Sequence, residues 1–211
     1  MTRPSRAADK LLTTALRLFA RQGIRPVGIN LILDQANGNK DTLYRVFGDK
    51  DGLVAATLDH YAQHLPWLQT LQNAAAELQR LQQETTAAGD VAGRAQDRLL
   101  AVFDTAATQA ATADYQGCFL LTAAIELRNS PNHPARQVIA ARHQQVRDLL
   151  HQLATAAGAS DPQQLAAWLQ RDLYGLLVEP ILGQPAPPDA IRQQLQATLA
   201  VALGPANPPH P

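Results

Sequence analysis

The 211 residues, 46% hydrophobic and 17% charged, are enough for one large domain or two small ones and exclude a disordered chain. No apolar run reaches the roughly 18 residues that span a bilayer, and charged residues interrupt the N-terminus where a secretory signal would be apolar. The single cysteine excludes an internal disulfide. We therefore expect a cytoplasmic protein without a membrane partner.

The net charge of zero conceals an asymmetry along the chain. Residues 1–50 contain nine Lys or Arg and four Asp, a net charge of +5, whereas residues 51–211 carry −5. A basic segment attached to an acidic remainder indicates a polyanion as partner at one end of the chain. The alternative is an ordinary basic face in contact with solvent.

The N-terminal segment predicts two helices. Apolar residues at helical spacing between residues 8 and 19 predict a first helix, with Ser5 in position to cap its start and Gly23 to end it. A second, shorter helix fits residues 28–36, where Ile29, Ile32, Leu33 and Ala36 share one face. We expect the apolar faces of these two helices to be buried against each other.

A turn and a third helix follow. Asn37-Gly38-Asn39 is a turn signal because Asn and Gly tolerate positive φ. The third helix runs from about 40 to 46, and Asp49 is in position to cap a fourth. Two short helices joined by a three-residue turn, with a longer helix bracing the first, form a helix-turn-helix.

Three stretches now resemble a known family. Residues 11–23, 29–36 and 40–53 resemble the DNA-binding domain of the TetR family of bacterial one-component regulators, and T-L-Y-x-x-F-x-x-K-x-x-L from Thr42 is their most distinctive part. The chain departs from the family at Asn37-Gly38, where Gly and a small aliphatic residue are usual, and at Val46, where His or Tyr is usual. The first departure would alter the turn, and the second would remove a phosphate contact.

The third helix is the predicted DNA-reading element. A helix N-terminus presents free N–H groups to phosphate, and hydroxyl and cationic side chains add directed contacts. We expect Leu43 and Phe47 to hold the helix on the other two. The expected DNA-binding residues are Asn39, Lys40, Thr42, Tyr44, Arg45 and Lys50.

Beyond residue 50 the pattern stays helical, and no alternating strand pattern occurs. We predict an all-α fold of about nine helices, with a helix-turn-helix domain over residues 1–50, an effector-binding and dimerisation domain over 51–204 and a flexible tail over 205–211. In the second domain we expect a helix from 50 kinked at Pro66, a loop over 85–93, and helices over 94–113, 117–129, 130–157 (capped by Ser130, with Pro131 in its first turn), 161–182 and 189–203.

The resemblance implies that the second domain contains a cavity for a small-molecule effector. Aromatic and apolar side chains with few charges nearby are candidates for its wall, although for any single one of them a place in the core is favoured. The candidates are Trp67, Phe103, Tyr115, Cys118, Phe119 and Trp168.

Other polar residues allow more than one interpretation. Cys118 at a helix start has the position of a redox-sensing thiol, but a lone cysteine without cationic neighbours favours simple packing. His60 and His64 share a helix face but lack a third metal ligand, which favours surface histidines. Glu126 and Glu179 in apolar stretches need an arginine (Arg128, Arg142 or Arg171) or a polar ligand group, and the sequence leaves both possibilities open.

The last two helices are apolar on more than one side, which predicts cover by a second copy and hence a homodimer. With the resemblance, the expected function is a repressor that leaves a palindromic operator on double-stranded DNA when an effector binds. No nucleophile motif, phosphate loop or dinucleotide fingerprint is present, so we expect no enzyme activity and no cofactor. The competing classes are a helical-bundle enzyme or carrier, whose carboxylate set is missing, and an architectural DNA binder without effector.

Overall fold

The fold is that of a computed structural model, which describes residues 6–83, 88–183 and 187–204. These residues form ten α-helices and one 3₁₀-helix, with no strand among them, which confirms the predicted all-α class. None of these helices is long and apolar enough to cross a bilayer. The predicted Ser5 cap and the predicted flexible tail over 205–211 lie outside the described residues.

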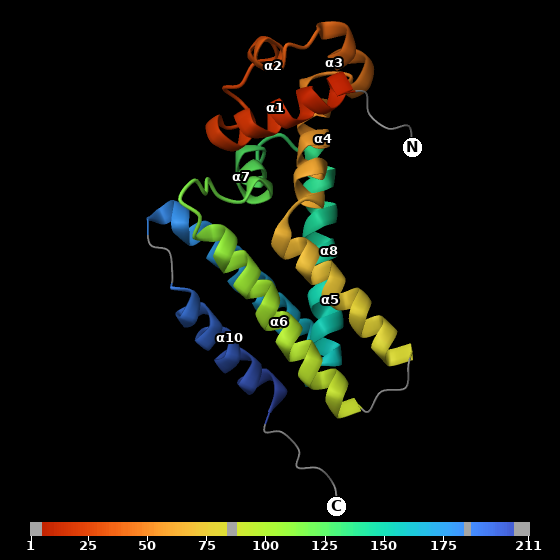
Figure 1. Ribbon diagram of the computed structural model, residues 1–211, viewed down its shortest axis with the longest axis vertical. Helices are drawn as coiled ribbons and strands as arrows, with labels where there is room; N and C mark the ends of the chain where they lie inside the picture. Colours follow the sequence, from red (N-terminus) through yellow and green to blue (C-terminus); the bar gives the residue numbers. More distant parts are fainter. Residues whose placement is uncertain (1–5, 84–87, 184–186, 205–211) are drawn as a thin grey trace, which may run out of the picture. The chain divides into compact units, whose positions relative to one another are not determined.

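The helices divide into two compact units (Figure 1). The first comprises residues 1–64 and 116–143, the second residues 65–115 and 144–211. In the first are α1 (Arg6–Gln22), α2 (Ile29–Ala36), α3 (Lys40–Phe47), α4 (Lys50–Gln63), α7 (Phe119–Glu126) and the beginning of α8 (Ala135–Ala156). The predicted division at residue 50 concerns function and stays a prediction.

The first unit has a core that two short helices could not build alone. An isolated eight-residue helix is unstable in water, so α2 and α3 depend on tertiary burial. Ile32 of α2 and Leu43 of α3 are fully buried, as is Leu11 of α1. Each such side chain contributes roughly 1.5–3 kcal/mol on burial. Leu43 is core as predicted, whereas Phe47 is half-buried.

The turn between α2 and α3 accommodates the Asn37-Gly38 departure. Asn37 has φ 46°, a left-handed conformation that Asn tolerates and that ends α2. The Gly38 N–H donates to the Leu33 carbonyl at 2.9 Å. A Cβ on Gly38 would lie 2.7 Å from Leu11 Cδ2, so a side chain there would require the Leu11 side chain to shift.

The turn between α3 and α4 is equally tight. The Asp49 carboxylate caps α4, as predicted, by accepting the Gly52 N–H at 2.8 Å. A Cβ on Gly52 would lie 2.0 Å from the Phe47 carbonyl oxygen. Because real Cβ atoms do not approach so closely, this turn requires glycine at position 52.

The second unit is a helical bundle built on α6. It contains α5 (Pro66–Gln83), α6 (Ala88–Ala110), the rest of α8, α9 (Pro162–Val178), the 3₁₀-helix η1 (Glu179–Leu182) and α10 (Pro188–Leu203). The helices α5, α9 and α10 all pack on α6, and Figure 1 shows α10 running along it. Asp161 caps α9 through the Gln164 N–H at 2.9 Å, which confirms the predicted start of that helix.

Two predicted boundaries are wrong because of proline. At Pro66 the chain does not kink within one helix: α4 ends at Gln63 and α5 begins at Pro66, where the missing proline N–H costs nothing. The helix predicted from Ser130 begins instead at Ala135. Pro134 disfavours helical geometry at His133, so the helix starts only after the second proline.

The loop predicted over 85–93 is also wrong in part. Residues 84–87 lie outside the description, but α6 already begins at Ala88. The segment contains no proline, and its small residues permit a helix that their weak apolar pattern does not predict.

Candidate nucleic-acid interface

The start of α3 is capped and open to solvent. Asn39 Oδ1 accepts the Thr42 N–H at 2.8 Å, which fixes the first turn. Asn39 and Lys40 are exposed. The N–H groups of the first turn that the cap does not use therefore point outward with the positive end of the helix dipole, next to a lysine. A phosphate group fits such a position.

The outer face of α3 bears large side chains that a folded chain would normally bury. Tyr44 is 49% exposed and Val46 is 45% exposed, and Arg45 between them is exposed as well. The opposite face holds the fully buried Leu43. An exposed face with a hydroxyl, a guanidinium and an apolar side chain suits base edges, thymine methyl groups and phosphates.

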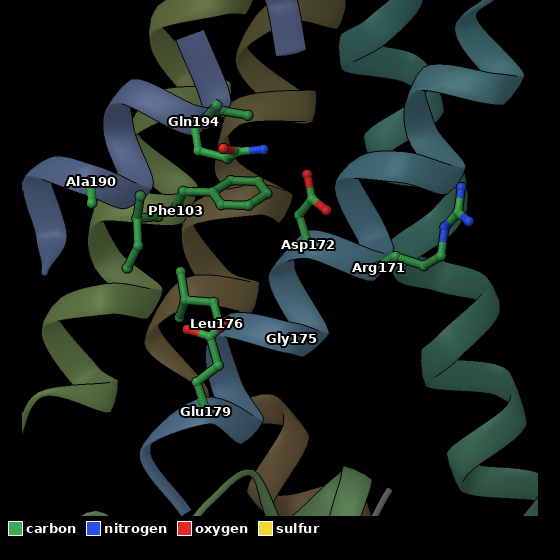
Figure 2. Close-up of a pocket in the computed structure, with 10 residues that line it drawn as sticks. Phe103, Arg171, Asp172, Gly175, Leu176, Glu179, Ala190 and Gln194 are labelled. Atoms are coloured by element: carbon green, nitrogen blue, oxygen red, sulfur yellow. The ribbon is translucent and has the colours of Figure 1, made fainter. Parts of the chain in front are cut away.

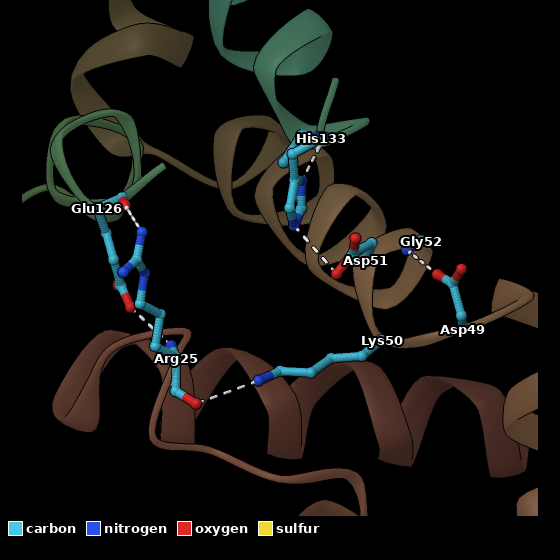
Figure 3. A network of polar contacts seen from close by, with 8 residues as sticks. Arg25, Asp49, Lys50, Asp51, Gly52, Glu126 and His133 are labelled. Carbon is cyan, nitrogen blue, oxygen red and sulfur yellow. Dashed lines mark hydrogen bonds and ion pairs between the residues drawn. The ribbon is translucent and has the colours of Figure 1, made fainter. Parts of the chain in front are cut away.

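Thr42 and Lys50 are less accessible than their neighbours. Thr42 is only 8% exposed, and its backbone N–H already donates to the Asn39 side chain. Lys50 Nζ donates to the Arg25 carbonyl at 3.4 Å (Figure 3). Burial lowers the pKa of the Lys50 ammonium group, and the charges of Asp51 and Glu126 oppose this shift. The role of all six expected DNA-binding residues stays a prediction.

Around Lys50 lies a polar network that the sequence did not predict. Glu126, at the end of α7, accepts the N–H groups of Ile24 and Arg25, and His133 pairs with Asp51 at 3.3 Å (Figure 3). The sequence left an arginine or a ligand open as the partner of Glu126, whereas its carboxylate binds backbone amides of the turn between α1 and α2. A separation of about a hundred residues leaves no sequence signal for this contact.

The side chains proposed for an effector cavity fall into four groups. Phe103 lines a cavity of about 400 Å³ between α6, α9 and α10, together with Asp172, Leu176 and Gln194 (Figure 2). Trp168 lines a more open hollow of about 560 Å³ between α9 and α10. Trp67 and Tyr115 belong to the same unit: Trp67 is buried, and the Tyr115 hydroxyl donates to the Leu177 carbonyl at 2.9 Å.

Cys118 and Phe119 lie in the other unit, with the helix-turn-helix. Phe119 stacks on Phe19 with ring centroids 6.4 Å apart and meets Tyr61 edge-on at 5.8 Å. Cys118 is buried, and burial raises the pKa of its thiol above the ordinary value. A buried thiol with a raised pKa carries little thiolate, which supports packing over redox sensing.

The histidine pair forms a local contact on α4. His64 Nδ1 lies 2.8 Å from the His60 carbonyl oxygen, and the two rings are 4.3 Å apart. Burial, with the adjacent His64 next in effect, lowers the pKa of His60. In the part of the chain that the structure describes, no three His, Cys, Asp or Glu side chains are placed to hold a metal ion.

Comparison with known proteins identifies relatives of this fold. The family model for "Bacterial regulatory proteins, tetR family" matches residues 11–57. The chain is 25% identical over 170 residues, 80% of each protein, to the HTH-type transcriptional regulator YjdC of Escherichia coli (strain K12). A TetR-type regulator from Streptomyces avermitilis MA-4680 is 28% identical, with a TM-score of 0.71 over 94% of this chain and 98% of that one.

The same fold occurs in a DNA complex. A cysteine mutant of the TetR family regulator CifR, bound to 26-bp double-strand operator DNA, is 18% identical with a TM-score of 0.65, over 96% of this chain and 98% of that one. The fold and the exposed α3 define a helix-turn-helix transcriptional regulator that binds DNA. Residues 11–57 match the TetR family of bacterial regulatory proteins, and the chain as a whole has the fold of regulators of that family.

Proposed function

We propose that the chain is a cytoplasmic repressor that occupies a palindromic operator as a two-fold dimer and leaves it when a small molecule binds the second unit. The exposed, capped α3 carries this proposal, because it presents the Tyr44 and Arg45 side chains to solvent on its outward face. Two copies of α3 related by a two-fold axis would read half-sites about one helical turn, roughly 34 Å, or a multiple apart.

The proposed dimer surface is the outer face of α9 and α10. Val201 is 78% exposed on α10, and Trp168 of α9 lines the same open hollow. An exposed valine beside a half-buried tryptophan is typical of an interface. A second copy of the same two helices would cover them in an isologous four-helix arrangement.

The proposed effector site is the cavity beside Phe103. Its volume of about 400 Å³ falls within the range of small-molecule sites, and an aromatic wall faces the Asp172 carboxylate and the Gln194 amide (Figure 2). Burial raises the pKa of the Asp172 carboxyl group, and the adjacent Arg171 opposes the rise. An effector at this site shifts the equilibrium only as far as it binds the two states of the protein with different affinity.

The test begins with a duplex selected by the wild-type protein from a random-sequence library, labelled for fluorescence anisotropy at several salt concentrations. We expect affinity to fall steeply with salt, and Lys40→Ala to reduce the slope of log affinity against log salt by about 1, because one phosphate contact is lost. Tyr44→Ala should reduce discrimination between the selected duplex and a scrambled one.

Arg80→Ala is the matched control, since Arg80 is an exposed cation on α5 of the other unit. It should leave both affinity and slope unchanged. Equal effects of Lys40→Ala and Arg80→Ala would show that only net charge matters and would refute α3 as the reading helix.

A further inference from the structure

The N–H groups of Ile24 and Arg25 lie in the turn between α1 and α2, outside both helices. The N–H of Gly23 closes α1 by donating to the Phe19 carbonyl at 2.9 Å. Ile24 and Arg25 follow in the turn, and Pro26 has no N–H. Ile24 is 3% exposed, so its N–H needs a partner inside the protein. An unsatisfied buried donor is costly in free energy.

Glu126 supplies that partner. Its two carboxylate oxygens accept the Ile24 N–H at 2.8 Å and the Arg25 N–H at 2.6 Å, and the Arg25 guanidinium donates to the Glu126 carbonyl at 3.3 Å (Figure 3). Hydrogen bonds to a carboxylate are roughly twice as strong as neutral ones. The position of the turn therefore depends on a side chain from α7.

Gly23 leaves room for this contact. It has φ +84°, which a side chain would strain, and a Cβ there would lie 3.2 Å from Glu126 Oε2. The glycine that ends α1 thus also allows the carboxylate to approach the turn.

Glu126 does not stabilise its own helix. It is the last residue of α7, where the negative end of the helix dipole disfavours a carboxylate. The helix is held by other contacts, since Phe119 at its start packs on Phe19 and Tyr61. The acid at the end of α7 is therefore explained by the turn that it binds.

The turn that Glu126 holds also contacts the start of α4. Arg25, whose N–H is fixed by Glu126, offers its carbonyl oxygen to Lys50 Nζ. Lys50 is the first residue of α4 and one of the proposed phosphate contacts. A displacement of the turn would move this acceptor, and the lysine would lose the position that the turn gives it.

We propose that Glu126 is a positioning residue for DNA binding: its carboxylate fixes the turn between α1 and α2, and the Arg25 carbonyl in that turn places Lys50 for a DNA phosphate. This inference rests on the proposed function, in which Lys50 contacts DNA. It makes DNA affinity depend on α7, a helix more than sixty residues beyond the reading head. A change that moves α7 therefore changes DNA affinity without touching α3.

The experiment measures anisotropy of the library-selected duplex at several salt concentrations with four proteins: wild type, Glu126→Gln, Lys50→Ala and the double variant. Glutamine has the same size as glutamate but turns its NH₂ toward one of the two N–H groups, so one bond becomes a clash between donors. We expect roughly ten-fold weaker binding and a salt slope lower by about 1 for Glu126→Gln. In the double variant, the slope should equal that of either single variant.

Three comparisons make the result decisive. Glu77→Gln replaces an acid that pairs with Arg98 in the other unit, and it should bind DNA as wild type does. Gly23→Ala places a methyl group against the same carboxylate. It should therefore lower the slope of log affinity against log salt as Glu126→Gln does. Circular dichroism at the assay temperature gives the folded fraction of each variant, and a mere loss of folded protein would leave the slope unchanged.

A wild-type slope and affinity for Glu126→Gln, or slope changes that add in the double variant, would refute the positioning role alone. A Lys50→Ala protein with an unchanged slope would instead refute Lys50 as a phosphate contact, and the proposed function would lose that residue.

Discussion

Glycine has opposite roles at two positions of this chain. At position 52 a Cβ would meet the Phe47 carbonyl oxygen at 2.0 Å, whereas at position 93 it would meet nothing within 4 Å. Gly93 lies within α6, where glycine is less stable than alanine because it loses more backbone freedom on folding. The same chemical change should therefore have opposite signs at the two sites.

We predict that Gly52→Ala lowers the free energy of unfolding by about 1–3 kcal/mol, because the turn between α3 and α4 must shift to admit a methyl group. Gly93→Ala should raise it by about 0.5–1 kcal/mol. Urea denaturation followed by circular dichroism measures both. A stabilised Gly52→Ala protein would mean that this turn has room which the structure does not give it.

At this scale, local contacts were predictable and distant ones were not. Asp49 and Asp161 are caps because a short acidic side chain reaches an N–H three residues later, and that spacing is visible in the sequence. Glu126 reaches a turn a hundred residues earlier, and its apolar surroundings indicated only that it needed a partner. The partner depends on how α7 packs.

Among the helices, α3 shows how one element serves both stability and recognition. Leu43 is fully buried and Val46 is 45% exposed, although only three positions separate them. Truncating a buried leucine costs the transfer free energy and leaves a cavity, whereas truncating an exposed valine costs little.

Leu43→Ala should accordingly lower the free energy of unfolding by about 2–5 kcal/mol, and Val46→Ala should change it by less than about 0.5 kcal/mol. Thermal unfolding of the two variants against wild type provides the measurement. A comparable loss for Val46→Ala would place that side chain in the core and contradict the orientation of α3.

Element boundaries were predictable where a capping residue stands alone and failed where two signals compete. Ser130-Pro131 and His133-Pro134 both have the pattern of a helix start, and the helix begins at Ala135 after the second. His133 Nδ1 there accepts the Ala135 N–H at 3.1 Å, a cap made by a ring rather than by a hydroxyl. Because Pro134 disfavours helical geometry at the residue before it, the second proline sets the boundary.

For the molecule as a whole, the proposed dimer depends on the outer face of α9 and α10. We predict that Val201→Asp shifts the protein from dimer to monomer in sedimentation equilibrium, because the dimer would have to bury a carboxylate in its apolar interface. Arg80→Asp, an exposed change on α5, is the control and should leave the assembly state unaltered. A Val201→Asp protein that stays dimeric would move the interface elsewhere.

The all-α class follows from periodicity in the sequence, but the grouping of helices does not. Contacts unite residues 1–64 with residues 116–143, although residues 65–115, which belong to the second unit, lie between them in the sequence. Hydrophobic patterns show that the Phe119 and Leu43 side chains must be buried. They do not show which helices pack against them. That pairing depends on packing of side chains far apart along the chain.

The composition of the first unit bears on the exchange of parts between relatives. A chimera that joins residues 1–64 of this chain to the remainder of another regulator would leave behind Phe119 and Glu126, which its Phe19 and its turn between α1 and α2 contact. A transplant that also carries residues 116–143 keeps those contacts. The exchangeable piece of this regulator is therefore discontinuous in sequence. A graft of the helix-turn-helix alone would lack the α7 contacts that hold it in place.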